Sequence, residues 1–91
     1  MTAKTPLILP DPNRFQTIAE FKESLLLGGE IAFRWEGTDY GICRTDRYCL
    51  AHADGSCEQW CDTPDEVLDC LIGSSRLREI ITRADILWRN L

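Results

Sequence analysis

The sequence predicts an α+β fold: a small antiparallel sheet of about four strands, with an N-terminal helix and one or two C-terminal helices packed on one face. The pattern T-x-x-E precedes an apolar periodic run twice, at Thr17–Glu20 and at Thr63–Glu66, and this pattern is typical of a helix N-terminus. Between the two sites, apolar and polar residues alternate and are interrupted by Gly37 and by Asp54-Gly55. Such a pattern is typical of strands joined by hairpins.

The first 14 residues are predicted to be an N-terminal arm, because three prolines interrupt them and no apolar period is present. Residues 15–91 are predicted to form a single α+β domain. The first helix is expected from Ile18 to about Leu27, and its capping glutamate should reach back to the N–H of the capping threonine. Gly28-Gly29 should end it, since glycine readily adopts the left-handed conformation that follows a helix.

The first hairpin is expected to begin with the strand Glu30–Glu36, in which apolar and polar residues alternate. A two-residue Gly37-Thr38 loop fits a type II′ turn, with glycine at its first central position. This loop would pair Trp35 with Tyr40, an aromatic pair that supports the register.

The third and fourth strands are expected at Arg47–Ala53 and Ser56–Cys61, with a type I′ turn at Asp54-Gly55. A three-residue loop, Thr45–Arg47, is favoured before the third strand because it places Tyr48 on the apolar face. A two-residue loop would turn the third and fourth strands over.

The second helix is predicted from Pro64 to about Leu71, and Ser74 or Ser75 is expected to cap a third helical element. The end of the chain is ambiguous, because Ile86–Trp88 can extend that element or form a short final strand. Periodicity alone leaves both possibilities open for residues 84–91.

Composition limits the classes of function. The chain has 91 residues, a net charge of −5 and five cysteines. No apolar stretch is long enough to span a membrane, and the apolar run near the N-terminus is too short for a secretion signal. A cytoplasmic location with reduced thiols is therefore expected. The negative charge disfavours direct binding to nucleic acid, whose phosphates attract basic proteins.

Acidic residues gather in one segment of the chain. Six of them lie between positions 54 and 69, where there is no lysine or arginine: Asp54, Glu58, Asp62, Asp65, Glu66 and Asp69. One interpretation is a solvated helix start, which the helix dipole favours. The other is an acidic face that contacts a basic protein surface, with Trp60 as its anchor on the outer face of the sheet. Alternatively, Trp60 is buried because the N-terminal arm or the C-terminal segment folds over it.

The cysteines and the one histidine suggest a zinc site, which needs four nitrogen or sulfur ligands in a tetrahedron. Cys57 and Cys61, however, lie on one predicted strand and would be roughly 13 Å apart. The hairpins instead oppose His52 with Cys57 and Cys43 with Cys49. No metal, cofactor or catalytic residue is therefore predicted. A zinc or thiol-redox module built on these five residues is kept as an alternative.

Three stretches resemble a diffuse family of small uncharacterised α+β proteins of Gram-positive bacteria, their phages and mobile elements. They are G-E-I-A-F followed by Y-G-I at Gly29–Ile42, D-T-P-D-E-V-L-D at Asp62–Asp69, and L-R-E-I at Leu77–Ile80. The family pattern is G-x-E-I-x-F, Y-x-I, a D-T-P-E-E-L-L helix and L-R-E-I. The resemblance covers about residues 18–86 and implies the α+β fold but no established activity.

The resemblance also implies a setting, since small acidic proteins of mobile elements often bind host or defence proteins, as anti-CRISPR proteins do. The sequence therefore predicts a non-catalytic protein that binds a protein partner, and the partner class that this setting suggests is a basic nucleic-acid-handling enzyme that it inhibits. A self-associating structural protein, for which a homodimer is possible, is the third hypothesis.

Overall fold

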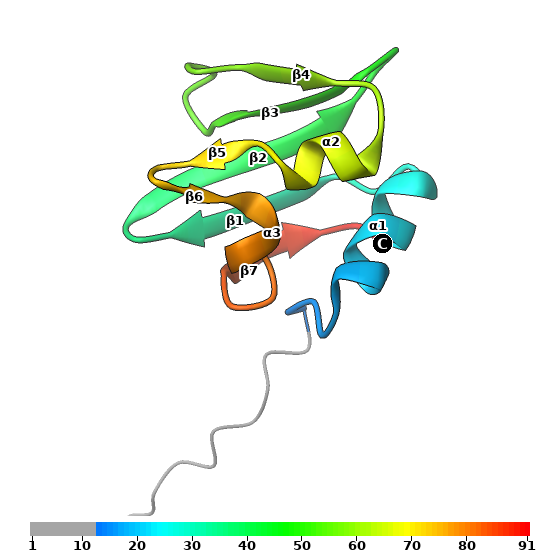
Figure 1. The fold of residues 1–91 in the computed structure, drawn as a ribbon, viewed down its shortest axis with the longest axis horizontal. Helices are drawn as coiled ribbons and strands as arrows, with labels where there is room; N and C mark the ends of the chain where they lie inside the picture. Colours follow the sequence, from blue (N-terminus) through cyan, green and yellow to red (C-terminus); the bar gives the residue numbers. More distant parts are fainter. Residues whose placement is uncertain (1–12) are drawn as a thin grey trace, which may run out of the picture.

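The computed structural model describes residues 13–91, so residues 1–12, most of the predicted arm, lie outside the described residues. The predicted α+β class is confirmed (Figure 1). In chain order the elements are α1 (Ile18–Leu26), β1 (Ile31–Trp35), β2 (Thr38–Arg44), β3 (Tyr48–His52), β4 (Gln59–Cys61), α2 (Pro64–Leu68), β5 (Leu71–Ile72), β6 (Ser75–Arg76), α3 (Leu77–Ile80) and β7 (Asp85–Arg89).

A five-stranded antiparallel sheet, in the order β4-β3-β2-β1-β7, lies at the centre of the described chain. The helices and the small β5–β6 hairpin pack against one face of this sheet (Figure 1). The expectation of about four strands omitted β7. This strand pairs with the edge of β1, where it provides partners for backbone groups that a sheet edge would leave unpaired.

Both expected N-terminal caps are present. The Thr17 hydroxyl accepts a hydrogen bond from the Glu20 N–H at 3.0 Å, and the Thr63 hydroxyl accepts one from the Glu66 N–H at 3.2 Å. The glutamates do not reach back to the threonine N–H as expected. Each glutamate instead accepts from the N–H of the residue before the threonine. Glu20 accepts from the Gln16 N–H at 2.7 Å, and Glu66 accepts from the Asp62 N–H at 2.7 Å.

The two C-terminal helices are shorter than predicted. α2 ends at Leu68 rather than Leu71, because the chain leaves it to form β5. The expected serine cap of the third helix is wrong, since Ser75 belongs to β6 and Arg76 is the N-cap of α3. The Arg76 N–H donates to the Glu79 carboxylate at 2.7 Å, which stabilises this short helix.

The turn between β1 and β2 differs from the expected type. Glu36 and Gly37 both have positive φ, +51° and +81°, which is the conformation of a type I′ turn. The turn is therefore Glu36-Gly37 instead of Gly37-Thr38, and Trp35 pairs with Thr38 instead of Tyr40. Because the pairing of β2 with β1 is shifted by two residues from the expected register, every side chain keeps its predicted face.

The register of β3 follows the three-residue loop, since Arg44 pairs with Tyr48. β4 is shorter than the expected Ser56–Cys61, and its ladder to β3 stops at Gln59. Cys57 has a φ of +57°, which is incompatible with a regular strand. The turn before it is not type I′, because Gly55 has positive φ and Asp54 does not.

The core lies between the covered face of the sheet and the helices. The inward side chains of the sheet include Phe33, Tyr40 and Leu50, which are almost fully buried. Phe15 is an unexpected member, because it follows the predicted arm directly, and its ring meets that of Phe21 edge-on with centroids 5.3 Å apart.

Removing a cap should destabilise the fold measurably. Thr63→Ala is expected to lower the free energy of unfolding by about 0.5–2 kcal/mol, because an N–H at the helix start loses its acceptor, and Thr17→Ala should cost a similar amount. Denaturant unfolding measures both. Thr45→Ala is the matched control, since that exposed loop side chain makes no hydrogen bond within residues 13–91. If both cap variants unfold like the control, the helix starts are wrong.

Candidate functional site

The face of the sheet away from the helices carries small side chains at its centre. Ala32 of β1 pairs with Gly41 of β2, which pairs with Ala51 of β3, so the three form one row across the central strands. They line a shallow hollow of about 330 Å³. Since no other element of residues 13–91 packs on this row, we call it the open face.

Large apolar side chains stand at both edges of the open face. Trp60 on β4 pairs with Cys49 and is 46% exposed, which confirms the predicted outward position of this side chain. On β7, Trp88 pairs with Ala32 and is 51% exposed. A register shift next to this pair leaves Leu87, also exposed, without a partner on β1. The sequence could not indicate this second edge, because the conformation of residues 84–91 was open.

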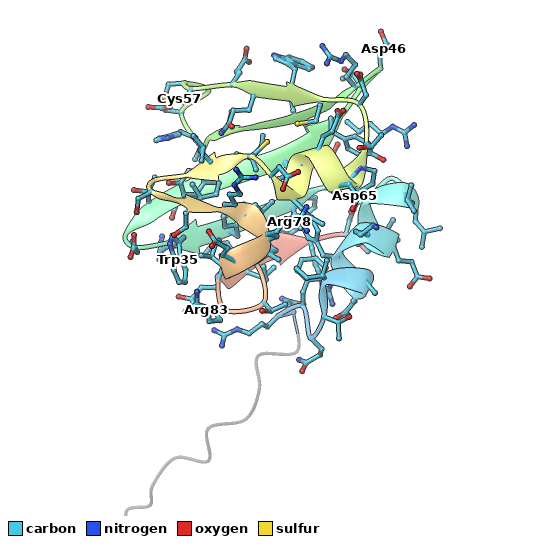
Figure 2. All side chains as sticks on the ribbon, in the orientation of Figure 1. Trp35, Asp46, Cys57, Asp65, Arg78 and Arg83 are labelled. Carbon is cyan, nitrogen blue, oxygen red and sulfur yellow. The ribbon has the colours of Figure 1, made fainter. Side chains whose placement is uncertain are left out.

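The third tryptophan lies in a different environment. Trp35 packs against the core, half-buried, with the Arg83 guanidinium 5.3 Å from the centroid of its ring. Figure 2 shows the two side chains next to each other beside α3. This tryptophan therefore already has a cationic partner within the chain.

Three of the six clustered acids are in ion pairs within the chain. Asp62 accepts from Arg47 at 2.6 Å, and Asp65 lies 3.0 Å from the Lys22 ammonium. Asp69 accepts from Arg78 at 2.9 Å, with Arg76 nearby at 3.6 Å. The hydrogen bond from Arg78 holds the pKa of Asp69 below its usual value. The sequence showed the acids but not these partners, because each pairing depends on how the chain folds.

The remaining acids fall into two groups. Glu66 accepts a hydrogen bond from the Asp62 N–H at the start of α2, and Asp54 accepts from the N–H and hydroxyl of Ser56 at 2.8 and 2.6 Å, which lowers the pKa of Asp54. Glu58 is exposed, lines the hollow of the open face and forms no ion pair within residues 13–91. Of the seven predicted partner-binding residues, Glu58 and Trp60 thus lie on the open face.

Four of the five cysteines lie in two neighbouring pairs, and Cys57 belongs to neither. Cys43 and Cys49 face each other across β2 and β3, as predicted. Cys61 and Cys70, on the core side, have their sulfur atoms 3.4 Å apart, and this pair was not predicted because it depends on the path of the chain after α2. All five cysteines are free thiols.

The histidine lies apart from these thiol pairs. The His52 ring packs edge-on against Tyr40, with centroids 5.0 Å apart. Within residues 13–91, no three side chains of the types that bind metal converge on one point.

Comparison with known proteins gives no further assignment. No family model matches the chain, and no curated protein or solved structure matches it. The resemblance to small proteins of Gram-positive bacteria and their mobile elements therefore stays a prediction. In the described part of the chain, no helix has the length and apolar character needed to cross a membrane.

The thiols should differ sharply in reactivity. Burial raises the pKa of Cys49, and burial together with the hydrogen bond to Cys61 raises the pKa of Cys70 to about 12. Because the thiolate is the reactive form, Cys43 and Cys57, both exposed, should be alkylated first in the native protein at pH 8. Timed iodoacetamide labelling with peptide mass spectrometry measures this order.

The unfolded chain is the control for this order, and there all five cysteines should react alike. Native Cys70 reacting as fast as Cys57 would contradict the described packing of α2 on the sheet.

Proposed function

We propose that this chain is a non-catalytic protein-binding domain that acts through the open face of its sheet. The observation that carries the proposal is the pair of exposed tryptophans at the two edges of the open face, where Trp88 lines the hollow and Trp60 lies on the opposite edge strand. Tryptophan is the side chain most often responsible for binding energy in protein interfaces.

The centre of the open face suits close approach. Gly41 has no side chain, and Ala32 and Ala51 beside it have only a methyl group. A partner side chain can therefore approach the sheet backbone closely between the flanking indole rings. Close contact between a partner side chain and the sheet would exclude water, which is a condition for strong binding by interface residues.

The charge of the chain favours a basic partner. The net charge is −5, and Glu58 on the open face has no cationic partner within residues 13–91. Opposite charge speeds the encounter of two proteins and excludes like-charged competitors. A basic nucleic-acid-handling enzyme, inhibited in the way of an anti-CRISPR protein, is the finer form of this proposal. The proposal also includes a cytoplasmic location, which agrees with the free thiols of the chain.

The open face has more support than the acidic segment as the contact surface. Asp62, Asp65 and Asp69 each hold a cation of the same chain. A partner would have to displace those cations before it met the carboxylates as an imitation of nucleic-acid phosphates. Trp60 and Glu58, from the same predicted set, need no such exchange.

Removing either tryptophan should weaken partner binding. We expect Trp60→Ala and Trp88→Ala each to weaken a purified complex by about 2 kcal/mol, roughly 30-fold, as central interface residues do. Candidate partners are captured with the wild-type chain, identified, and reconstituted as purified pairs, whose affinity is measured by calorimetry. Both side chains are also about half buried, so each variant should lose some stability with its apolar contacts, and denaturant unfolding checks that it is folded under the conditions of the binding measurement.

Leu26→Ala and Leu27→Ala are the matched controls, because these apolar side chains at the end of α1 are 62% and 67% exposed. The proposal fails if every reconstituted complex tolerates the tryptophan substitutions, or if the leucine controls weaken binding equally. Light scattering of the isolated chain separates the self-associating alternative. A dimer that Trp88→Ala dissociates would assign the open face to a second copy.

A further inference from the structure

Two rows of side chains cross the open face in opposite directions, and each runs from a tryptophan at one edge to a glutamate near the other. The first row is Trp88, Ala32, Gly41 and Ala51, and one step beyond the last bonded pair it reaches Glu58. The second row is Trp60, Cys49 and Cys43, and one step beyond β1 it reaches Glu30.

The opposite directions of the rows bring a tryptophan and a glutamate together at each edge. Glu58 precedes Trp60 by two residues on the same face, a separation of roughly 6.6 Å along the chain. Glu30 is the diagonal neighbour of Trp88 across the β1–β7 ladder, where such pairs are about 7–8 Å apart. Glu30, Glu58 and Trp88 all line the hollow. We call these two pairs the tryptophan–glutamate corners.

The carboxylates of both corners are exposed and form no ion pair within residues 13–91. The nearby cation of the same face, Arg34, is held by Asp39 at 2.6 Å. The negative charge of Glu58 contributes, after burial, to raising the pKa of Cys49, which agrees with its position over this face. Each corner thus offers an indole ring and an uncompensated negative charge.

We infer that the open face recognises a protein segment carrying two arginine side chains, one for each tryptophan–glutamate corner. The inference rests on the proposed function and names the chemistry of its partner. A guanidinium is planar, so it stacks on an indole ring while it donates two parallel hydrogen bonds to a carboxylate, whereas an ammonium is a compact charge without a stacking plane or a paired set of donors. A second copy of this chain is disfavoured, since it would bring glutamate against glutamate.

The chain already uses this combination internally. Arg89 lies 4.2 Å above the centroid of the Phe15 ring while it donates to the Glu20 carboxylate at 3.3 Å. The corners of the open face present the same two groups, an aromatic ring and a carboxylate, without the cation.

The spacing of the corners sets the spacing of the arginines. Trp88 on β7 and Trp60 on β4 are separated by four strand intervals, roughly 19 Å. An extended chain advances about 3.3 Å per residue, so arginines six residues apart span this distance and point to the same side.

The experiment uses a seven-residue glycine–serine peptide with arginine at its first and last positions. Its binding to the full chain is followed through the indole N–H signals in a nitrogen–proton NMR spectrum. The Trp60 and Trp88 signals should shift, and that of Trp35 should not, because Arg83 already occupies its ring. A citrulline version, which keeps the shape without the charge, should bind about tenfold more weakly, and a lysine version should fall between the two.

Single charge removals test each corner. Glu58→Gln should reduce the shift of Trp60 and leave that of Trp88, and Glu30→Gln should do the reverse. Glu23→Gln, an exposed acid on α1, is the matched control and should change neither signal. A peptide whose arginines are three residues apart cannot reach both corners at once. It should therefore bind more weakly than the peptide whose arginines are six residues apart.

The inference is overturned if the arginine and citrulline peptides bind alike, if Trp35 shifts as much as the other two, or if neither glutamine variant alters its corner. In that case a reconstituted complex that still depends on Trp60 and Trp88 would keep the proposed function. If the peptide binds as expected but no reconstituted complex depends on these tryptophans, the proposed function fails and the corner chemistry stands alone.

Discussion

The structure depends on one-sided burial in its three central strands. Phe33, Tyr40 and Leu50 point toward the helices and are almost completely buried, whereas the central row of the other face consists of Ala32, Gly41 and Ala51. Burial of the large side chains provides most of the driving force for folding. Because a strand alternates its faces residue by residue, this choice also determines which face all the helices must cover.

The same alternation gives the open face its character. A second apolar layer on that face would need large side chains to pack against, and the central row has only small ones. The large apolar groups stand instead at the two edges, where β4 and β7 place Trp60 and Trp88. Most ion pairs of the described chain lie away from this face, so a carboxylate such as Glu58 is available to pair with a cation of a partner. Fold and proposed function thus follow from one pattern of large and small residues.

Local features of this chain could be predicted from its sequence, and features that depend on distant segments could not. The caps at Thr17 and Thr63 need only four residues each, and the pairing of Cys43 with Cys49 follows from one short loop. The pairing of β7 with β1 depends on an unpaired edge that no local pattern reveals. The same holds for the ion pair of Asp65 with Lys22, 43 positions earlier in the chain, which changes the interpretation of the acidic segment.

The most direct test of the account is the solvent accessibility of the three indole rings in the isolated full chain, measured as line broadening by a neutral gadolinium chelate. The account predicts strong broadening for Trp60 and Trp88 and weaker broadening for Trp35, which packs against the core beneath Arg83. Protection of Trp60 and Trp88 equal to that of Trp35 would mean that part of the chain or a second copy covers this face. That result would contradict the claim that the face is open for a partner.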